Sequence, residues 1–113
     1  MLLSTKGDDV KKVQFRQGDV LITKVASRTK TSQPKGRDAG RIVLAYGEVT
    51  GHAHAIADLN ALLFSDGDDL YLEADGTVSL RHEEHARIEI PGGTYKITRQ
   101  REYTPGEIRN VAD

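Results

Sequence analysis

Apolar and polar residues alternate over several stretches of the chain, and no stretch sustains the 3.6-residue apolar period of a helix. Residues 20–25 (Val-Leu-Ile-Thr-Lys-Val) are rich in β-branched side chains. In residues 86–90 the alternation places Ile88 and Ile90 on one face, and residues 94–103 begin with the same pattern. These patterns predict an all-β protein.

Turn-forming residues divide the alternating pattern into about seven to nine short strands. The expected strands cover residues 13–15, 20–25, 41–56 with a bulge or a close backbone approach at Gly47, 61–64, 70–73, 78–81, 86–90 and 94–103. Asp75-Gly76 favours the positive φ angles of a tight turn, so the strands on either side are expected to form a hairpin. Strands this numerous and short predict one domain, residues 1–113, built as a two-sheet sandwich or a closed β-barrel, because a single open sheet would leave one face wet.

Three segments lack the alternation. Residues 1–11 are polar and are expected to form a flexible N-terminus. Residues 26–40 are rich in Ser, Thr, Lys and Gly and are expected to form a long basic loop. Residues 104–109 are expected to allow one helical turn, capped by Thr104 and with Pro105 at its first position.

The net charge of -1 hides an uneven distribution of charge. Residues 1–46 carry ten Lys and Arg against four Asp and Glu, whereas residues 47–113 carry six against thirteen. The basic half lacks the interleaved aromatic residues that stack on bases, which argues against nucleic-acid binding. No apolar run approaches the roughly 20 residues of a membrane span, and the first residues lack the apolar segment of a secretory signal. A cytoplasmic protein without membrane contact is therefore expected.

The main functional signal is the position of the four histidines, which form two short pairs about thirty residues apart: His52 and His54, then His82 and His85. Residues two apart in a strand point to the same face, so His52 and His54 are expected to project side by side. Residues 82–85 are expected to connect two strands and to turn one or both rings inward. The two pairs together predict one shared metal site.

The chemistry of this site is restricted by the absence of cysteine, which leaves only nitrogen and oxygen ligands. Histidines with or without a carboxylate suit a divalent transition metal (Zn, Fe, Mn, Ni or Cu), and ligand type alone does not choose among them. Glu83 and Glu84 are the candidate catalytic residues, with Glu48 a further candidate, because a carboxylate beside a metal ion can take a proton. Unrelated surface histidines, and a metal-free acid–base site, are the alternatives.

A pair of arginines near the C-terminus gives a second, weaker signal. Arg99 and Arg101 lie two apart and would share a strand face, as would Arg101 and Tyr103. Such a pair can grip an anionic ligand, and it can equally be a solvated face of the sheet.

The run Gly51-His52-Ala53-His54, followed by Asp58 and later by Ile90-Pro91-Gly92-Gly93, resembles the cupins, a family of small metal-binding β-barrels. The resemblance implies a metal held by His52 and His54, with Asp58 where the family usually has Glu. It covers about a third of the chain, and the histidine that cupins place after the Pro-Gly turn is replaced here by Tyr95 and Lys96. The Gly-Glu-Val-Thr-Gly-His-Ala-His run is also similar to small uncharacterised bacterial and phage proteins.

Two functions follow as hypotheses. The first is a metal-dependent enzyme acting on a small molecule, with hydrolysis and oxygen chemistry both open. The second is a non-enzymatic module in which a metal or the histidine cluster holds a loop or an interface, and the basic segment 26–40 contacts a protein partner. The sequence leaves the oligomeric state open, including a homo-oligomer.

Overall fold

The computed structural model describes residues 13–100, and all of its regular structure is β. The N-terminal segment 1–11, the helical turn expected at 104–109, and Arg101 with Tyr103 lie outside the described residues. Residues 13–100 contain no helix that is long and apolar enough to cross a membrane.

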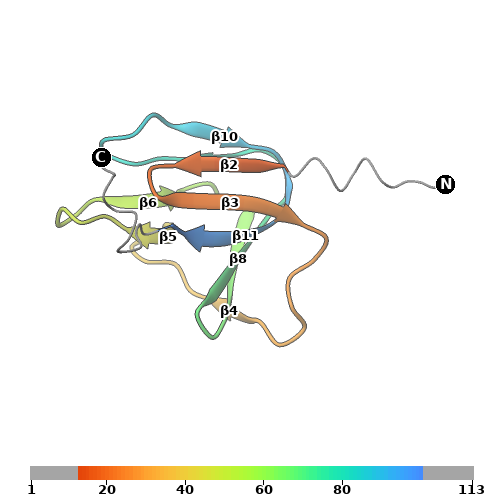
Figure 1. The fold of residues 1–113 in the computed structure, drawn as a ribbon. Coiled ribbons are helices and arrows are strands. Elements are labelled where there is room, and N and C mark those ends of the chain that lie inside the picture. The colour runs from red at the N-terminus through yellow and green to blue at the C-terminus, as the bar shows by residue number, and fades with distance from the viewer. Residues whose placement is uncertain (1–12, 101–113) are drawn as a thin grey trace, which may run out of the picture.

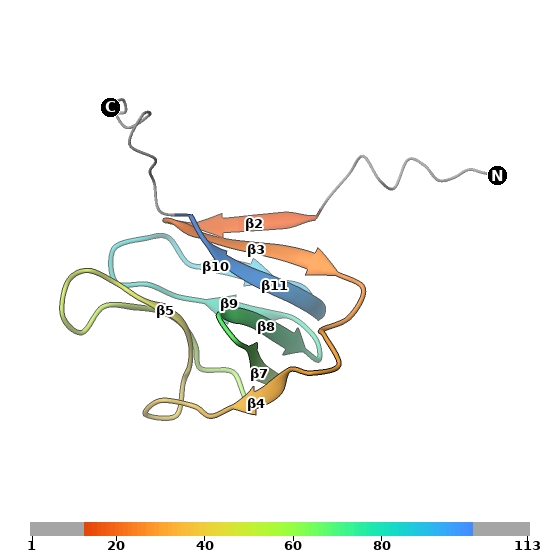
Figure 2. The same cartoon turned by 60° about the horizontal axis from the view of Figure 1, so that its bottom comes forward.

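The larger layer is a six-stranded sheet in which every neighbouring pair is antiparallel. Figure 2 shows its strands following one another from β2 at one edge to β4 at the other. In spatial order they are β2 (Gln14–Gln17), β3 (Val20–Val25), β11 (Gly93–Arg99), β8 (Asp69–Ala74), β7 (Ala61–Asp66) and β4 (Gln33–Lys35).

The second layer consists of two short antiparallel pairs. These are β5 (Ile42–Tyr46) with β6 (Ala53–Ile56), and β9 (Val78–Leu80) with β10 (Ile88–Ile90). The pairs are joined by one bridge, in which Ala55 and Arg81 exchange two backbone hydrogen bonds of 2.9 Å. The fold is therefore a small all-β sandwich, and the alternative of a closed barrel was wrong.

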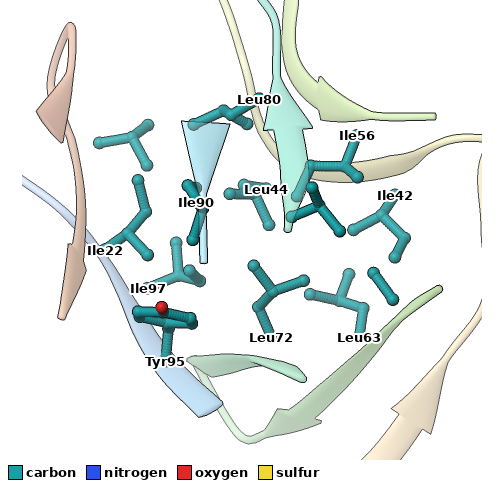
Figure 3. Packing of buried hydrophobic residues seen from close by; sticks show 13 residues of the cluster. Ile22, Ile42, Leu44, Ile56, Leu63, Leu72, Leu80, Ile90, Tyr95 and Ile97 are labelled. Atoms are coloured by element: carbon teal, nitrogen blue, oxygen red, sulfur yellow. The ribbon is translucent and has the colours of Figure 1, made fainter. Parts of the chain in front are cut away.

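The core fills the space between the two layers, with side chains of both pointing toward one another (Figure 3). Alternation produces this face in β3, where Val20 and Ile22 are fully buried while Leu21 and Thr23 are only partly buried. Tyr95 of β11 is also fully buried, and its hydroxyl donates to the carbonyl of Pro91 at 2.6 Å. The single phenolic donor is thus satisfied inside an apolar core.

Three expectations about pairing and loops were wrong. The strands expected at 70–73 and 78–81 do not form a hairpin with each other. Instead, β8 pairs with β7 and β11, while β9 pairs with β10 in the other layer. The Asp75-Gly76 turn instead carries the chain from one layer to the other, with Gly76 at φ +101°. A local turn preference cannot distinguish these outcomes, because strand pairing also depends on contacts with strands that are distant in the sequence.

The second correction concerns residues 41–56, which form a hairpin and not one bulged strand. Gly47 lies in the loop between β5 and β6, where its amide donates to the carbonyl of His52 at 2.8 Å. The register irregularity falls earlier, between Val43 and Ala45. The histidines are therefore separated by a strand boundary, with His52 in the loop and His54 inside β6.

The third correction concerns segment 26–40, which is not one long loop. It contains β4, which pairs with β7, and it is tied to the sheet by side chains. Arg28 lies 3.8 Å above the ring of Phe64 and forms an ion pair with Glu73 at 3.1 Å. Arg37 donates to the carbonyls of Asp58 and Ala61. Much of the basic charge thus serves internal contacts.

The interlayer core can be tested with Leu72→Ala on β8 and Leu62→Ala on the neighbouring β7. Leu72 is fully buried, whereas the side chain of Leu62 is 60% exposed. We expect Leu72→Ala to lower the free energy of unfolding by about 2–5 kcal/mol, because it leaves a cavity. Leu62→Ala is expected to change it by about 0.5 kcal/mol or less. Urea denaturation measures both, and equal effects would contradict the assignment of the core face.

Candidate functional site

Three connections meet at one end of the sandwich, on the left in Figures 1 and 2: the β2–β3 turn, the β5–β6 loop and the β9–β10 connection. All four histidines belong to the last two connections or to the strand beside them, as the sequence predicts for a shared cluster. The imidazole centroids of His54 and His82 lie 4.3 Å apart, those of His82 and His85 4.6 Å, and those of His52 and His82 5.7 Å. His82 thus lies between the other three rings.

His54 is the buried member of the cluster, with 2% of its surface exposed. It lies on β6 between Ala53 and Ala55, so it shares a face with Ile56 and points into the interlayer space. The small alanines on the opposite face pack with Val43 in a separate apolar cluster. A polar ring so enclosed requires a hydrogen-bond partner.

That partner is Gln17, a 3% exposed residue at the end of β2. The Gln17 amide nitrogen donates to the carbonyls of Leu80 and Ala86, both at 3.0 Å. These two acceptors fix the orientation of the amide, so its oxygen faces Nδ1 of His54 at 2.8 Å. Nδ1 must therefore carry the proton and donate a hydrogen bond to the Gln17 oxygen. In the neutral ring the lone pair is then on Nε2.

The charge state of His54 follows from its surroundings. Burial, and after it the nearby His82, lowers the pKa of His54 to about 4. The ring is therefore neutral near pH 7, with Nε2 available as an acceptor or a metal ligand. Metal-binding histidines usually donate their second ring N–H to a fixed acceptor in this way.

Asp19 stands next to this lone pair. Its Oδ1 lies 3.8 Å from Nε2 of His54, and its Oδ2 accepts a hydrogen bond from Nε of Arg99 at 2.9 Å. Burial alone would raise the pKa of Asp19, but the hydrogen bond and charge of Arg99 outweigh it, so the net pKa is lowered. Arg99 also donates to the carbonyl of Tyr46. The carboxylate therefore stays ionised beside the neutral imidazole.

Gly18 allows Asp19 and two of the rings to converge. It has φ +59°, and a Cβ at this position would lie 2.8 Å from Nε2 of His85 and 3.2 Å from Cε1 of His54. Both the backbone angle and the available space therefore favour glycine. We call Asp19, His54 and His85 the inner group.

On the solvent side, ligand atoms of His52, His82 and Glu83 all lie within 4.8 Å of one another, the only such group of three among residues 13–100. We call these residues the outer group. The Ala53 amide donates to Oε1 of Glu83 at 2.9 Å. This hydrogen bond is the main cause of the lowered pKa of Glu83, and it fixes the carboxylate against the β5–β6 hairpin.

The remaining carboxylates of the sequence prediction are Glu84, Asp58 and Glu48, and none of them belongs to the outer group. Oε2 of Glu84 is 3.5 Å from Nδ1 of His52, at the exposed edge of the cluster. Asp58, the expected counterpart of a cupin carboxylate, instead accepts a hydrogen bond from the backbone amide of Ser79 at 3.2 Å. It belongs to no ligand group among the described residues.

Gln17 and Asp19 were missed as site residues, because their segment was interpreted only as a turn. One signal was available for Gln17: it is two residues after Phe15, so alternation places it on the inward face of β2. A polar side chain at an inward position needs a buried partner. No comparable signal existed for Asp19, since its contact with His54 joins residues 35 positions apart.

An apolar hollow of about 210 Å³ lies elsewhere, between β4, β5 and β7. Its walls include Pro34, Ile42, Leu62 and Phe64, with Lys35 and Arg37 as its charged members. Neither a histidine nor a carboxylate lines it, so it is separate from the cluster.

The fold and the site together define a small all-β sandwich with a polyhistidine cluster at one end. The chain belongs to the family described as Domain of unknown function (DUF8820), whose model matches residues 16–100. The match spans all six residues of the inner and outer groups, and Gln17. No curated protein and no solved structure matches the chain. The resemblance to cupins therefore remains a prediction.

The role of Gly18 can be tested with Gly18→Ala, using Gly67→Ala as the matched control. Gly67 has nearly the same φ, +62°, in the β7–β8 turn, but a Cβ there would meet no atom within 4 Å. Both changes are expected to destabilise the fold by about 1–2 kcal/mol through the left-handed backbone. Only Gly18→Ala should shift the imidazole NMR signals of His54 and His85. Unchanged signals in that variant would show that the rings do not depend on Gly18.

The buried state of His54 predicts a pH dependence of stability in metal-free protein. In the unfolded chain His54 binds a proton below about pH 6.5, whereas in the folded protein it does so only near pH 4. Between these values the unfolded state holds more protons, so stability falls as the pH falls, with a slope of up to about 1.4 kcal/mol per pH unit. Urea denaturation across this range measures it. His54→Leu should flatten the slope, and an unchanged slope would contradict the assignment.

Proposed function

We propose that this protein binds a divalent transition-metal ion through the outer group of its histidine cluster. The observation that carries the proposal is the convergence of His52, His82 and Glu83, whose ligand atoms lie within 4.8 Å of one another. Two imidazoles and a carboxylate form a ligand set that suits Zn, Fe, Mn, Ni or Cu. The residues come from two connections that are distant in sequence, so the site depends on the fold.

The hydrogen bonds around the outer group support this proposal for Glu83 and set a condition for His82. The Ala53 amide holds the Glu83 carboxylate in place and favours its ionised form. Nδ1 of His82 accepts a hydrogen bond from the Glu84 amide at 3.0 Å. In a neutral ring this leaves the proton on Nε2. Metal binding at His82 therefore requires either release of Nδ1 by the Glu84 amide or a turn of the ring about its Cβ–Cγ bond.

The same arrangement suits a metal-dependent enzyme acting on a small molecule. Three protein ligands leave at least one coordination position open, and an ion there would act as a Lewis acid toward a bound oxygen atom. Glu83 is committed to the ligand set, so Glu84 is the carboxylate that remains to accept a proton. It reaches within 3.5 Å of His52, and its side chain is 61% exposed. Hydrolysis and oxygen chemistry both fit this arrangement.

A second candidate, a structural metal site in a non-enzymatic module, is favoured by a different observation. The outer group joins the β5–β6 loop to the β9–β10 connection, next to the single Ala55–Arg81 bridge that links β6 to the end of β9. An ion there would fasten the two halves of the second layer. A role for segment 26–40 in binding a protein partner would rely on Lys30 and Lys35, both exposed, because Arg28 and Arg37 make internal contacts.

Metal binding can be measured directly by Zn²⁺ calorimetry on tag-free protein purified without chelator. We expect Glu83→Gln to weaken the affinity by at least about 10-fold, since even the loss of a residue that only supports a ligand has an effect of that size. Glu89→Gln is the matched control. Glu89 lies on β10 and is an exposed carboxylate that contacts Ser79 and Arg87. Equal affinities in both variants would rule Glu83 out as a ligand.

Cobalt substitution separates the enzyme from the structural module. An open coordination position predicts that the visible spectrum of the Co²⁺-loaded protein changes when azide is added. A site closed by four protein ligands predicts no change. A spectrum insensitive to azide would therefore overturn the enzymatic proposal while leaving metal binding intact.

A further inference from the structure

The inner group brings two acceptors close together, one on the buried His54 and one on Asp19, whose side chain is 39% exposed. The Gln17 oxygen accepts a hydrogen bond from Nδ1–H of His54, so the lone pair of the ring is on Nε2, which lies 3.8 Å from Oδ1 of Asp19. Arg99 occupies Oδ2 of the same carboxylate and leaves Oδ1 on the side of the imidazole. Nε2 of this 2% exposed ring accepts no hydrogen bond from any residue between 13 and 100.

The separation of these two atoms fits a shared cation. Imidazole nitrogen and carboxylate oxygen bind Zn²⁺ at about 2.1 Å, so two ligands of one ion lie at most about 4.2 Å apart and about 3.4 Å apart in a tetrahedron. The observed 3.8 Å lies between these values. A decrease of a few tenths of an ångström in the distance between Nε2 and Oδ1 would bring the two atoms to their tetrahedral separation.

His85 supplies the third side chain from the β9–β10 connection, and its ring must move to complete the set, because the ligand atoms of Asp19, His54 and His85 do not all lie within 4.8 Å of one another. Its Nε2 and Cε1 of His54 lie against the same side of Gly18, at 2.8 and 3.2 Å from the position of a Cβ there. The His54 and His85 rings are nearly parallel, with centroids 5.8 Å apart. His85 belongs to an exposed part of the connection, so its side chain can adjust toward the inner position more easily than His54 can.

We propose that Asp19, His54 and His85 bind a second divalent transition-metal ion, beside the ion held by His52, His82 and Glu83. Gln17 and Arg99 act as positioning residues: Gln17 selects the His54 tautomer, and Arg99 orients the carboxylate. His82 lies between the two groups, 4.3 Å from His54 and 5.7 Å from His52 between ring centroids. The inference extends the proposed function and rests on it for the outer ion, giving one cluster with two adjacent cations.

Two ions held side by side would clamp one substrate oxygen or phosphoryl group between them, which is the arrangement used in many two-metal hydrolases. The inner ion would carry the negative charge of Asp19, whereas the outer ion would carry that of Glu83. Each ion thus has one anionic ligand. The charge of Asp19 is shared with Arg99, whose Nε lies 2.9 Å from Oδ2, so the inner ion is expected to be bound more weakly than the outer ion.

The test is the metal content of the full chain, measured by elemental analysis after loading with Zn²⁺ and desalting, and followed by Co²⁺ titration. We expect two equivalents in the wild type, one in Asp19→Asn and one in the His52→Ala/Glu83→Gln double variant. Asp68→Asn is the matched control, because Asp68 follows the positive-φ Gly67 as Asp19 follows Gly18, and it lies in a turn away from the cluster. This control should keep two equivalents.

Each failure has its own signature. One equivalent in the wild type that persists in Asp19→Asn would overturn the second ion and leave the proposed function standing. One equivalent that Asp19→Asn removes and the double variant retains would place a single ion in the inner group and overturn the outer site. No metal in any variant would overturn both proposals. If Asp19→Asn unfolds in urea at much lower concentration than the wild type, His85→Ala replaces it, since His85 is exposed.

Discussion

The hydrogen bonds of the buried Gln17 amide hold the functional end of the sandwich together. One side chain from β2 donates to the carbonyls of Leu80 and Ala86, at the two sides of the β9–β10 connection, and accepts from His54 of β6. Gln17 belongs to the six-stranded sheet, and its partners belong to the other layer. Because an unpaired buried amide is costly, this network specifies how the two layers meet at this end.

The histidine cluster is a consequence of that junction. His54 is buried and hydrogen-bonded to Gln17, whereas His52, His82 and His85 lie in connections closer to solvent. The tautomer of His54 is set by a neutral partner, so the ring is prepared to accept a cation or a hydrogen bond at Nε2 without carrying charge itself. The two carboxylates of the cluster, Asp19 and Glu83, are each fixed by a separate donor, Arg99 and the Ala53 amide. Metal-binding carboxylates are usually supported by hydrogen bonds in this way, which is consistent with the ligand roles that we propose for both residues.

Backbone geometry explains why the β2–β3 turn contributes to the site. Gly18 adopts a left-handed conformation, and the absence of its side chain leaves the space taken by the His54 and His85 rings. The same residue thus closes the hairpin and admits the imidazoles. The turn also places Gln17 before the glycine and Asp19 after it, so that one residue supports His54 at Nδ1 and the other faces its Nε2. A residue chosen for a turn therefore has a second role that local sequence does not reveal.

The sequence by itself determined the all-β class, most strand positions and the histidine pairs, because these depend on alternation and residue type within a short window. Val20 and Ile22 are buried as their alternation requires, and residues 82–85 do connect two strands. Only the tertiary structure decided that β9 pairs with β10 and not with β8, and that Asp58 accepts a hydrogen bond from the Ser79 amide. It also decided that Gln17 and Asp19 lie beside His54. These contacts join residues separated by 8 to 37 positions, and they are selected by burial and hydrogen bonding, which no local pattern encodes.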